Sequence, residues 1–248
     1  MSKPIAPKLL AEFIGTFAFV FIGAGAAAVI GDGTGLNGIA AIAFAHGLTI
    51  MVFAFAYGSI SGGHMNPAVT VGVLAAGAIR VGDALGYIVS QLVGGIAGAL
   101  VLRAVLGGTA TGLGMPQLAQ GLVLGATTVT ITPAAGFVIE AALAFFLVTV
   151  VLSTAVAGRA GNLAPLAIGM TVTLNIIMAA ALTGAPFNPA RALGPMVATG
   201  NFADAWLYTI APVIGAVIAA FVHLGLRRLA HEDRIGTQAP AAPAAPAE

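Results

Sequence analysis

Two copies of the triplet Asn-Pro-Ala interrupt sequence that is otherwise apolar enough to cross a membrane. Asn is a preferred N-cap and Pro is favoured at the first helical position, so each triplet predicts a short helix that starts inside the hydrophobic layer. Backbone without helical hydrogen bonds is tolerated at that depth only where protein buries it or where it lines a wet cavity. The two triplets, Asn66-Pro67-Ala68 and Asn188-Pro189-Ala190, therefore predict two half-helices beside a pore.

Composition places the chain in a membrane. It is 59% hydrophobic and 7% charged, with a mean hydropathy of +1.05, whereas soluble domains carry about 25% charged residues. The 248 residues accommodate about six spans of roughly 20 residues each. They leave no room for a soluble catalytic domain.

The sequence lacks the residues that several classes of function require. A net charge of +1 argues against a nucleic-acid partner. With no Cys and four scattered His, the chain shows no metal-ligand spacing and no disulfide framework. It also lacks a recognisable Ser/His/Asp set or paired catalytic acids. We expect neither an enzyme nor a metal or other cofactor.

The apolar runs predict an all-α membrane protein with six transmembrane helices. Spans are expected near residues 9–30, 38–58, 84–106, 134–157, 163–182 and 205–229, with half-spans near 66–77 and 188–199. The channel domain would occupy residues 1–229. The tail 230–248 ends in Ala-Pro repeats and is expected to be disordered on the cytoplasmic side.

The basic residues orient these spans. Seven of them fall on one side of a six-span topology, namely Lys3, Lys8, Arg80, Arg159, Arg227, Arg228 and Arg234. Only Arg103 and Arg191 lie toward the other side. The positive-inside rule then places both termini in the cytoplasm, which suits the inner (plasma) membrane of a cell. The uncharged stretch 107–132 is expected to form an external loop draped over the pore mouth.

The two halves of the chain, about 8–106 and 133–229, are related to each other. Asn66 and Asn188 are 122 residues apart, and so are Gly47 and Gly169. Further matches at nearly the same offset are Glu12 with Glu140, Tyr87 with Tyr208, and Gly94 with Gly215. An odd number of spans per repeat inverts the second repeat in the membrane. Inverted repeats with broken helices favour a substrate site at the midplane.

Polar residues inside the spans are the candidates for function. Two half-helix N-termini at the midplane would disfavour cations, and the amides of Asn66 and Asn188 keep donor capacity for a passing oxygen. Arg191 would repel cations at a constriction. Glu12 and Glu140 form either a proton relay or, as we favour, a scaffold whose carboxylates accept hydrogen bonds from the half-helix loops. His64 would line the pore vestibule.

The segments Ser61-Gly62-Gly63-His64-Met65-Asn66-Pro67-Ala68-Val69-Thr70 and Phe187-Asn188-Pro189-Ala190-Arg191 resemble the two signature loops of the aquaporin family, the major intrinsic proteins. The opening Ala11-Glu12-Phe13-Ile14-Gly15-Thr16 and Gln91 resemble the family as well. This resemblance implies a right-handed bundle of six spans and two half-helices, a pore in each protomer, and a homotetramer in the lipid bilayer.

The resemblance also maps a selectivity filter onto His46, Ile176, Ala185 and Arg191. This set resembles plant tonoplast intrinsic proteins, several of which pass ammonia or urea beside water. Neutral His46 could offer or accept a hydrogen bond there. Glycerol-conducting members carry an Asp where this chain has Ala192. The leading expectation is a passive channel for water and small neutral solutes that excludes protons and ions. A glycerol or urea facilitator and a proton-coupled secondary transporter are the alternatives.

Overall fold

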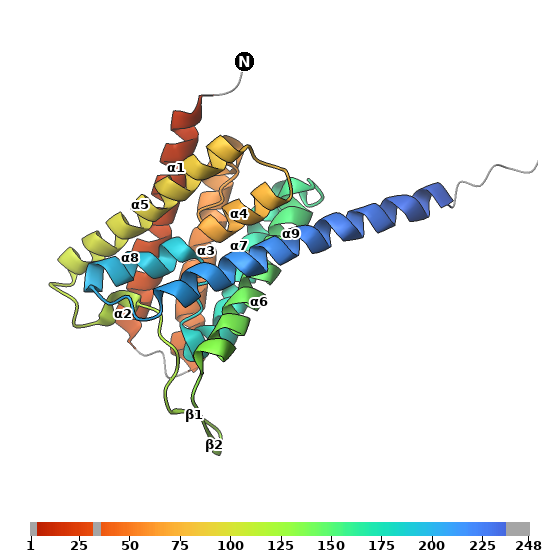
Figure 1. Cartoon of the computed structure of the whole chain (residues 1–248). Helices are drawn as coiled ribbons and strands as arrows, with labels where there is room; N and C mark the ends of the chain where they lie inside the picture. The colour runs from red at the N-terminus through yellow and green to blue at the C-terminus, as the bar shows by residue number, and fades with distance from the viewer. Residues whose placement is uncertain (1–3, 32–35, 237–248) are drawn as a thin grey trace, which may run out of the picture.

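The computed structural model describes residues 4–31 and 36–236 and is built almost wholly of helices (Figure 1). Six helical segments are long and apolar enough to cross a membrane, and two short helices lie among them, as predicted. The long helices are α1 (Ile5–Ala18), α3 (Leu36–Ser61), α5 (Val81–Val105), α6 (Pro133–Val151), α7 (Ala164–Thr183) and α9 (Ala205–Gly236). The short ones are α4 (Pro67–Ala75) and α8 (Pro189–Thr199).

Two of the spans contain π-helical turns. The first span continues from α1 through a π-helical stretch, Phe19–Ala24, into α2 (Gly25–Ile30). The fourth continues from α6 through another, Leu152–Val156. Short 3₁₀ turns at Gly112–Gly114 and Gly161–Leu163 belong to the connecting loops.

Equivalent close contacts between helices occur within each of the two halves. In the first half, a Cβ on Gly94 of α5 would lie 2.5 Å from the Phe13 carbonyl oxygen of α1. In the second half, Gly215 of α9 is packed in the same way against the Ala141 carbonyl of α6. The two glycines are repeat partners in sequence, so the same backbone approach is used twice.

The halves meet where α3 packs on α7. There Gly47 and Gly169 face each other, and a Cβ on either would lie 2.5–2.6 Å from the other's carbonyl oxygen. In turn, α8 lies against α5, and α4 lies against α9. Each half-helix thus packs on a long helix of the other half of the chain, and its first residue lies in the interior of the bundle.

The loop 107–132 lies only partly over the bundle. Leu113 is fully buried against α2, and Gln117 and Thr111 line a cavity at this end. Farther along, β1 (Leu122–Leu124) and β2 (Thr127–Val129) form a hairpin that projects away from the helices (Figure 1). We had expected this stretch to form an external loop draped over the pore mouth, and sequence analysis gave no sign of the hairpin. Gly125, with φ 60°, supplies the positive φ that a two-residue hairpin turn requires.

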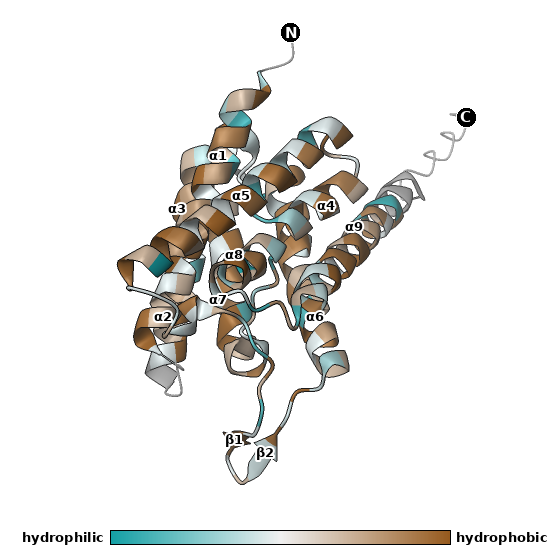
Figure 2. Cartoon of the chain, turned by 60° about the vertical axis from the view of Figure 1, so that its left-hand side comes forward, coloured by the Kyte–Doolittle hydropathy of each residue, from teal (hydrophilic) through white to brown (hydrophobic). Residues whose placement is uncertain are grey.

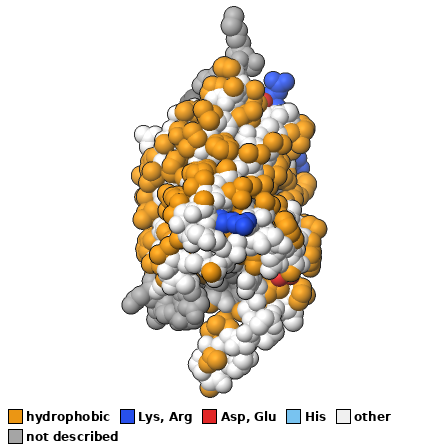
Figure 3. Space-filling model, turned by 90° about the vertical axis from the view of Figure 1, so that its left-hand side faces the viewer, with side chains coloured by type: hydrophobic (Ala, Val, Ile, Leu, Met, Phe, Trp, Pro, Cys, Tyr) orange, Lys and Arg blue, Asp and Glu red, His pale blue; other side chains and the backbone are white. Residues whose placement is uncertain are grey.

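Hydrophobic side chains cover the outside of the bundle, and polar ones lie within it. Figures 2 and 3 show apolar residues over the helices and charged ones at few places on the face in view. Phe55, Val89 and Leu174 are more than half exposed, whereas Glu12 and Glu140 are fully buried. This inverted pattern is that of an integral membrane protein.

The last helix extends beyond the predicted end of the channel domain. α9 continues to Gly236, into the tail 230–248 that we expected to be disordered. Residues 230–235 contain neither Pro nor Gly, so nothing in them ends the helix. Residues 237–248, with the Ala-Pro repeats, lie outside the described residues.

Candidate pore site

The two Asn-Pro-Ala triplets cap two half-helices that point at each other. Asn66 adopts an extended conformation, and its Oδ1 accepts the Ala68 N–H at 2.8 Å. Asn188 does the same for α8, accepting from Ala190 at 3.0 Å and Arg191 at 3.3 Å. In each helix Pro follows at the first position, where its missing N–H costs nothing.

Each Asn amide also ties its loop to the opposite loop. Asn66 Nδ2 donates to the Phe187 carbonyl at 3.1 Å, and Asn188 Nδ2 donates to the Met65 carbonyl at 2.9 Å. Met65 and Phe187 have positive φ values of 48° and 28°, unusual for residues with side chains. This backbone conformation accompanies the reciprocal pair, which uses one Nδ2 hydrogen of each Asn. The second Nδ2 hydrogen is left for the lumen.

Glu12 accepts four hydrogen bonds, three of them from the first loop and the end of α3 and one from α5. Its Oε1 accepts from Ser61 Oγ at 2.6 Å and His64 N at 2.9 Å. Its Oε2 accepts from Met65 N at 2.6 Å and Gln91 Nε2 at 2.7 Å. Four donors around two oxygens match a charged carboxylate.

Glu140 holds the second loop with two hydrogen bonds. Its Oε1 accepts from Thr183 Oγ1 at 2.6 Å, and its Oε2 accepts from Phe187 N at 2.7 Å. At the repeat offset, Pro186 stands where the first loop has His64, and Pro has no N–H to donate. Pro212 likewise stands where α5 has Gln91. The second carboxyl group therefore has fewer donors than the first.

Two tyrosines complete these loop anchors. Tyr87 donates its hydroxyl to the Ser61 carbonyl, and Tyr208 donates to the Thr183 carbonyl, each at 2.7 Å. Sequence reasoning matched Tyr87 with Tyr208 as repeat partners but gave them no role. A residue that recurs at the repeat offset beside a loop was the signal that could have found it.

The four residues mapped to a filter are all buried, and two of them are in contact. His46, Ile176, Ala185 and Arg191 are each at most 3% exposed. Arg191 Nε donates to His46 Nε2 over a long 3.4 Å. Ile176 and Ala185 belong to the buried apolar cluster that contains Ile42 of α3, one turn before His46.

The structure commits both ring nitrogens of His46 to protein groups. Nδ1 lies 2.8 Å from the Ile42 carbonyl oxygen, and because a carbonyl only accepts, Nδ1 carries the hydrogen. Nε2 is then the acceptor for Arg191. Arg191 also keeps unused capacity, since its Nη1 has no partner among the described residues.

Cavities approach the two loops from both ends of the bundle. The cavity at the end with the N-terminus, here the terminal-end cavity, is about 770 Å³ and is lined by Lys8, Arg80 and His64 among others. A central cavity of about 20 Å³ contacts Asn66 and Asn188. That volume holds about one water molecule.

A third cavity, here the hairpin-end cavity, is about 550 Å³ and reaches Arg191 from the opposite end of the bundle. The terminal-end and central cavities share His64 and Gly62 in their linings. The central and hairpin-end cavities have no lining residue in common. The level of His46 and Arg191 therefore separates them as a constriction.

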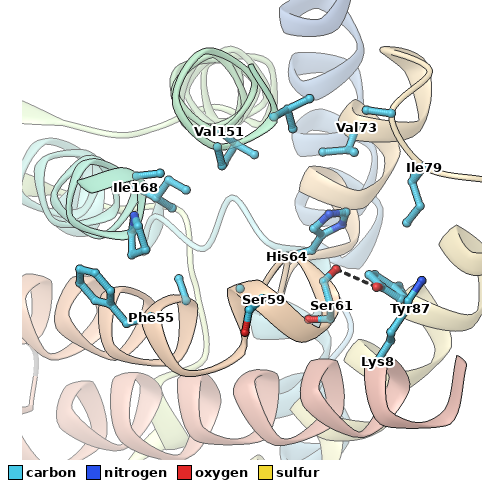
Figure 4. Close-up of a pocket in the computed structure, with 18 of the residues that line it drawn as sticks. Lys8, Phe55, Ser59, Ser61, His64, Val73, Ile79, Tyr87, Val151 and Ile168 are labelled. Carbon is cyan, nitrogen blue, oxygen red and sulfur yellow. Dashed lines mark hydrogen bonds between the residues drawn. The ribbon is translucent and has the colours of Figure 1, made fainter. Parts of the chain in front are cut away.

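His64 lies at the inner junction of these cavities (Figure 4). Its Nδ1 is 3.1 Å from Thr70 Oγ1, and its ring meets Tyr87 edge to face at 5.2 Å. Burial lowers the pKa of His64, and the nearby Glu12 charge offsets part of that effect. The neutral imidazole is thus the form at neutral pH. Residues 4–31 and 36–236 contain no group of three His, Cys, Asp or Glu suited to a metal ion.

Known proteins are similar to this chain in sequence and in fold. A family model described as "Major intrinsic protein" matches residues 2–223. The "Glycerol uptake facilitator protein-like 6" of Lactiplantibacillus plantarum is 40% identical over 86% of this chain and 95% of its own length. "Aquaporin TIP2-1" of Arabidopsis thaliana is 39% identical over 86% of this chain and 84% of its own length. The aquaglyceroporin of Plasmodium falciparum superposes with a TM-score of 0.76 at 22% identity, covering 92% of this chain and 99% of that one.

Proposed function

The chain belongs to the major intrinsic protein family, a family of passive channels, and from this premise we propose that it is a water pore that also passes small neutral solutes such as ammonia and urea and excludes protons and ions. The supporting observation is the pair of opposed Asn caps. Asn66 and Asn188 contact one cavity the size of a water molecule, and each keeps one amide hydrogen for its occupant.

Proton exclusion follows from the same pair. A continuous chain of water molecules passes protons, so the chain must be interrupted. A central water that accepts hydrogen bonds from Asn66 and Asn188 points its own hydrogens outward to both sides and cannot relay a proton. The positive ends of α4 and α8 also disfavour a cation there, and Arg191 repels one at the constriction.

The residues at the constriction support passage of solutes other than water. Ile176 and Ala185 are small or apolar, so a solute with fewer hydrogen bonds than water pays less to pass them. Relatives include aquaporins and a protein named as a glycerol uptake facilitator-like protein, which keeps glycerol among the solutes to test. Ala192 in place of the Asp of glycerol-conducting members favours water and smaller solutes over glycerol.

A proton-coupled transporter is the competing mechanism. It would need a buried acid whose protonation changes during transport, and among the described residues only Glu12 and Glu140 are buried acids. Glu12 accepts four hydrogen bonds and Glu140 two, all from the residues that hold the loops. These contacts favour a scaffold role for both acids.

We further propose that the protein is a homotetramer in the plasma membrane with cytoplasmic termini. Lys8, Arg80, Arg159, Arg227 and Arg228 belong to the segments at the terminal end of the bundle, which the positive-inside rule assigns to the cytoplasm. The hairpin β1–β2 would then lie outside.

Stopped-flow light scattering on proteoliposomes tests the function directly. Water, urea, ammonia and glycerol are compared side by side, and a pH-sensitive dye reports proton flux. We expect fast water flux with a low activation energy, ammonia flux above that of plain lipid, slower glycerol and no proton flux above empty vesicles. A high activation energy for water would favour a carrier that changes conformation, and dye acidification would contradict proton exclusion.

A further inference from the structure

Gly23, in the π-helical stretch Phe19–Ala24, faces the imidazole of His46 where the first span contacts α3. A Cβ on residue 23 would lie 2.5 Å from Cδ2 and 2.7 Å from Nε2 of His46. Ordinary contacts between such atoms are about 3.5–4.0 Å. The ring therefore rests directly against the Gly23 backbone, and no larger residue leaves room for it in this position.

Other contacts fix the ring on its remaining protein-facing sides. Its Nδ1 donates to the Ile42 carbonyl at 2.8 Å, and Phe19 packs edge to face against it with ring centroids 5.3 Å apart. Its Nε2 meets Arg191. Together with the Gly23 backbone, these contacts define the position of the imidazole.

We propose that Gly23 is a specificity-determining residue of the pore, because it lets His46 withdraw from the lumen and pair with Arg191. The inference rests on the proposed function and extends it to a residue outside the filter ring. A glycine here makes the constriction wider and commits the His46 nitrogens to protein. The solute then meets the imidazole mainly as a carbon surface.

A methyl group at position 23 would reverse both effects. The ring must move by about 1 Å, away from the first span and into the bundle, to regain an ordinary contact distance. The contact between Arg191 Nε and His46 Nε2, already 3.4 Å long, would then be lost. The constriction becomes narrower and gains polar groups, a change that admits water but excludes larger and less polar solutes.

Gly23→Ala is the test variant, and Gly82→Ala is its matched control. Gly82 lies in α5, a Cβ there would meet nothing within 4 Å, and the residue lines none of the three cavities described above. His46→Ala and the double variant with Gly23→Ala complete a double-mutant cycle. Without an imidazole to displace, the methyl group at position 23 should have no effect on selectivity.

Two readouts are made on proteoliposomes and on purified protein. The first is the ratio of urea and ammonia flux to water flux, which Gly23→Ala should reduce while water flux persists. The second is the ¹⁵N NMR signal of His46 in protein labelled at its four histidines, assigned by the His46→Ala variant. The Nε2 signal should shift in Gly23→Ala and stay in place in Gly82→Ala.

The outcomes separate this inference from the proposed function. Wild-type vesicles without water flux would reject the function, and wild-type vesicles that pass water alone would reject its solute breadth, while the NMR shift still decides the role of Gly23. An unchanged flux ratio together with an unmoved Nε2 signal overturns the inference. So does an effect of Gly23→Ala that persists undiminished in the His46→Ala background, since the cause would then be a packing defect in the first span.

Discussion

Replacing Glu12 by Gln should destabilise the protein more than replacing Glu140 by Gln. A Gln side chain presents one acceptor oxygen and one donor nitrogen. Around Glu12 every neighbour is a donor: Ser61 and His64 N–H on one oxygen, Met65 N–H and Gln91 on the other. The hydroxyl can rotate and the Gln91 amide can flip, but the two backbone N–H groups cannot. Whichever way the substituted amide at position 12 is placed, one buried N–H loses its acceptor.

A Gln side chain can keep both hydrogen bonds at position 140, which it cannot do for all four at position 12. In the Glu140→Gln variant, the amide oxygen can keep the Phe187 N–H, and the NH₂ group can donate to the Thr183 hydroxyl, which rotates to accept. Only the strengthening due to the charge is lost, on the order of 1 kcal/mol. An unsatisfied buried N–H costs a further 1–3 kcal/mol, roughly. Glu12→Gln should therefore be the more destabilising by about that amount.

Thermal unfolding of the purified protein in detergent, at one scan rate, measures the difference, because membrane proteins commonly unfold irreversibly. Asp83→Asn, which removes a half-exposed ion pair with Lys8, controls for the change from acid to amide. Protein that remains folded should still conduct water. Equal or reversed destabilisation of the two Gln variants would refute the hydrogen-bond argument, and stable variants without water flux would favour the proton relay.

Three further predictions concern other parts of the site. Arg103→Leu removes the donor that meets the Ala198 carbonyl at 2.9 Å near the end of α8, so thermal stability should fall by about 1 kcal/mol, whereas Arg228→Leu on α9 should change little. Burial lowers the pKa of His64, so below about pH 6.5 the unfolded chain binds a proton that the folded chain does not. Thermal stability should therefore decrease as the pH is lowered through this range. His64→Gln should make that decrease smaller in melting curves recorded over a pH series. Ile176→His should narrow the constriction and suppress ammonia flux in stopped-flow assays while water flux stays substantial.

Local rules predicted the helices and the half-helices well. Asn followed by Pro specifies a helix start through the cap and the fixed φ of Pro, and no long-range contact is needed. The offset between Asn66 and Asn188 then gave the inverted repeat. The hairpin β1–β2 was missed because the stretch 107–132 carries Gly and Thr throughout, so Gly125 did not stand out as a turn residue.

Features that depend on contacts between the halves could not be predicted. The positive φ values of Met65 and Phe187 accompany hydrogen bonds that cross from one loop to the other. Within the first half, the contact of the His46 ring with Gly23 joins two different helices and is likewise not visible in sequence spacing. Sequence spacing placed His46 near Arg191 through family resemblance, but it gave no information on which nitrogen of the ring would be free.

The two loops are held by different numbers of hydrogen bonds, and the loop with fewer of them is the one that carries residues of the mapped selectivity filter. Glu12 accepts three hydrogen bonds from the first loop and its helix end, and a fourth from Gln91 of α5. Glu140 accepts only two from the second loop and its helix end, because Pro186 has no N–H; this loop carries Ala185 and leads into Arg191. Its position therefore depends more on contacts with the first half of the chain, those of Asn66 with Phe187 and of Arg191 with His46. A substitution in the first half that moves His46 should thus alter selectivity more than a comparable one near the well-anchored first loop.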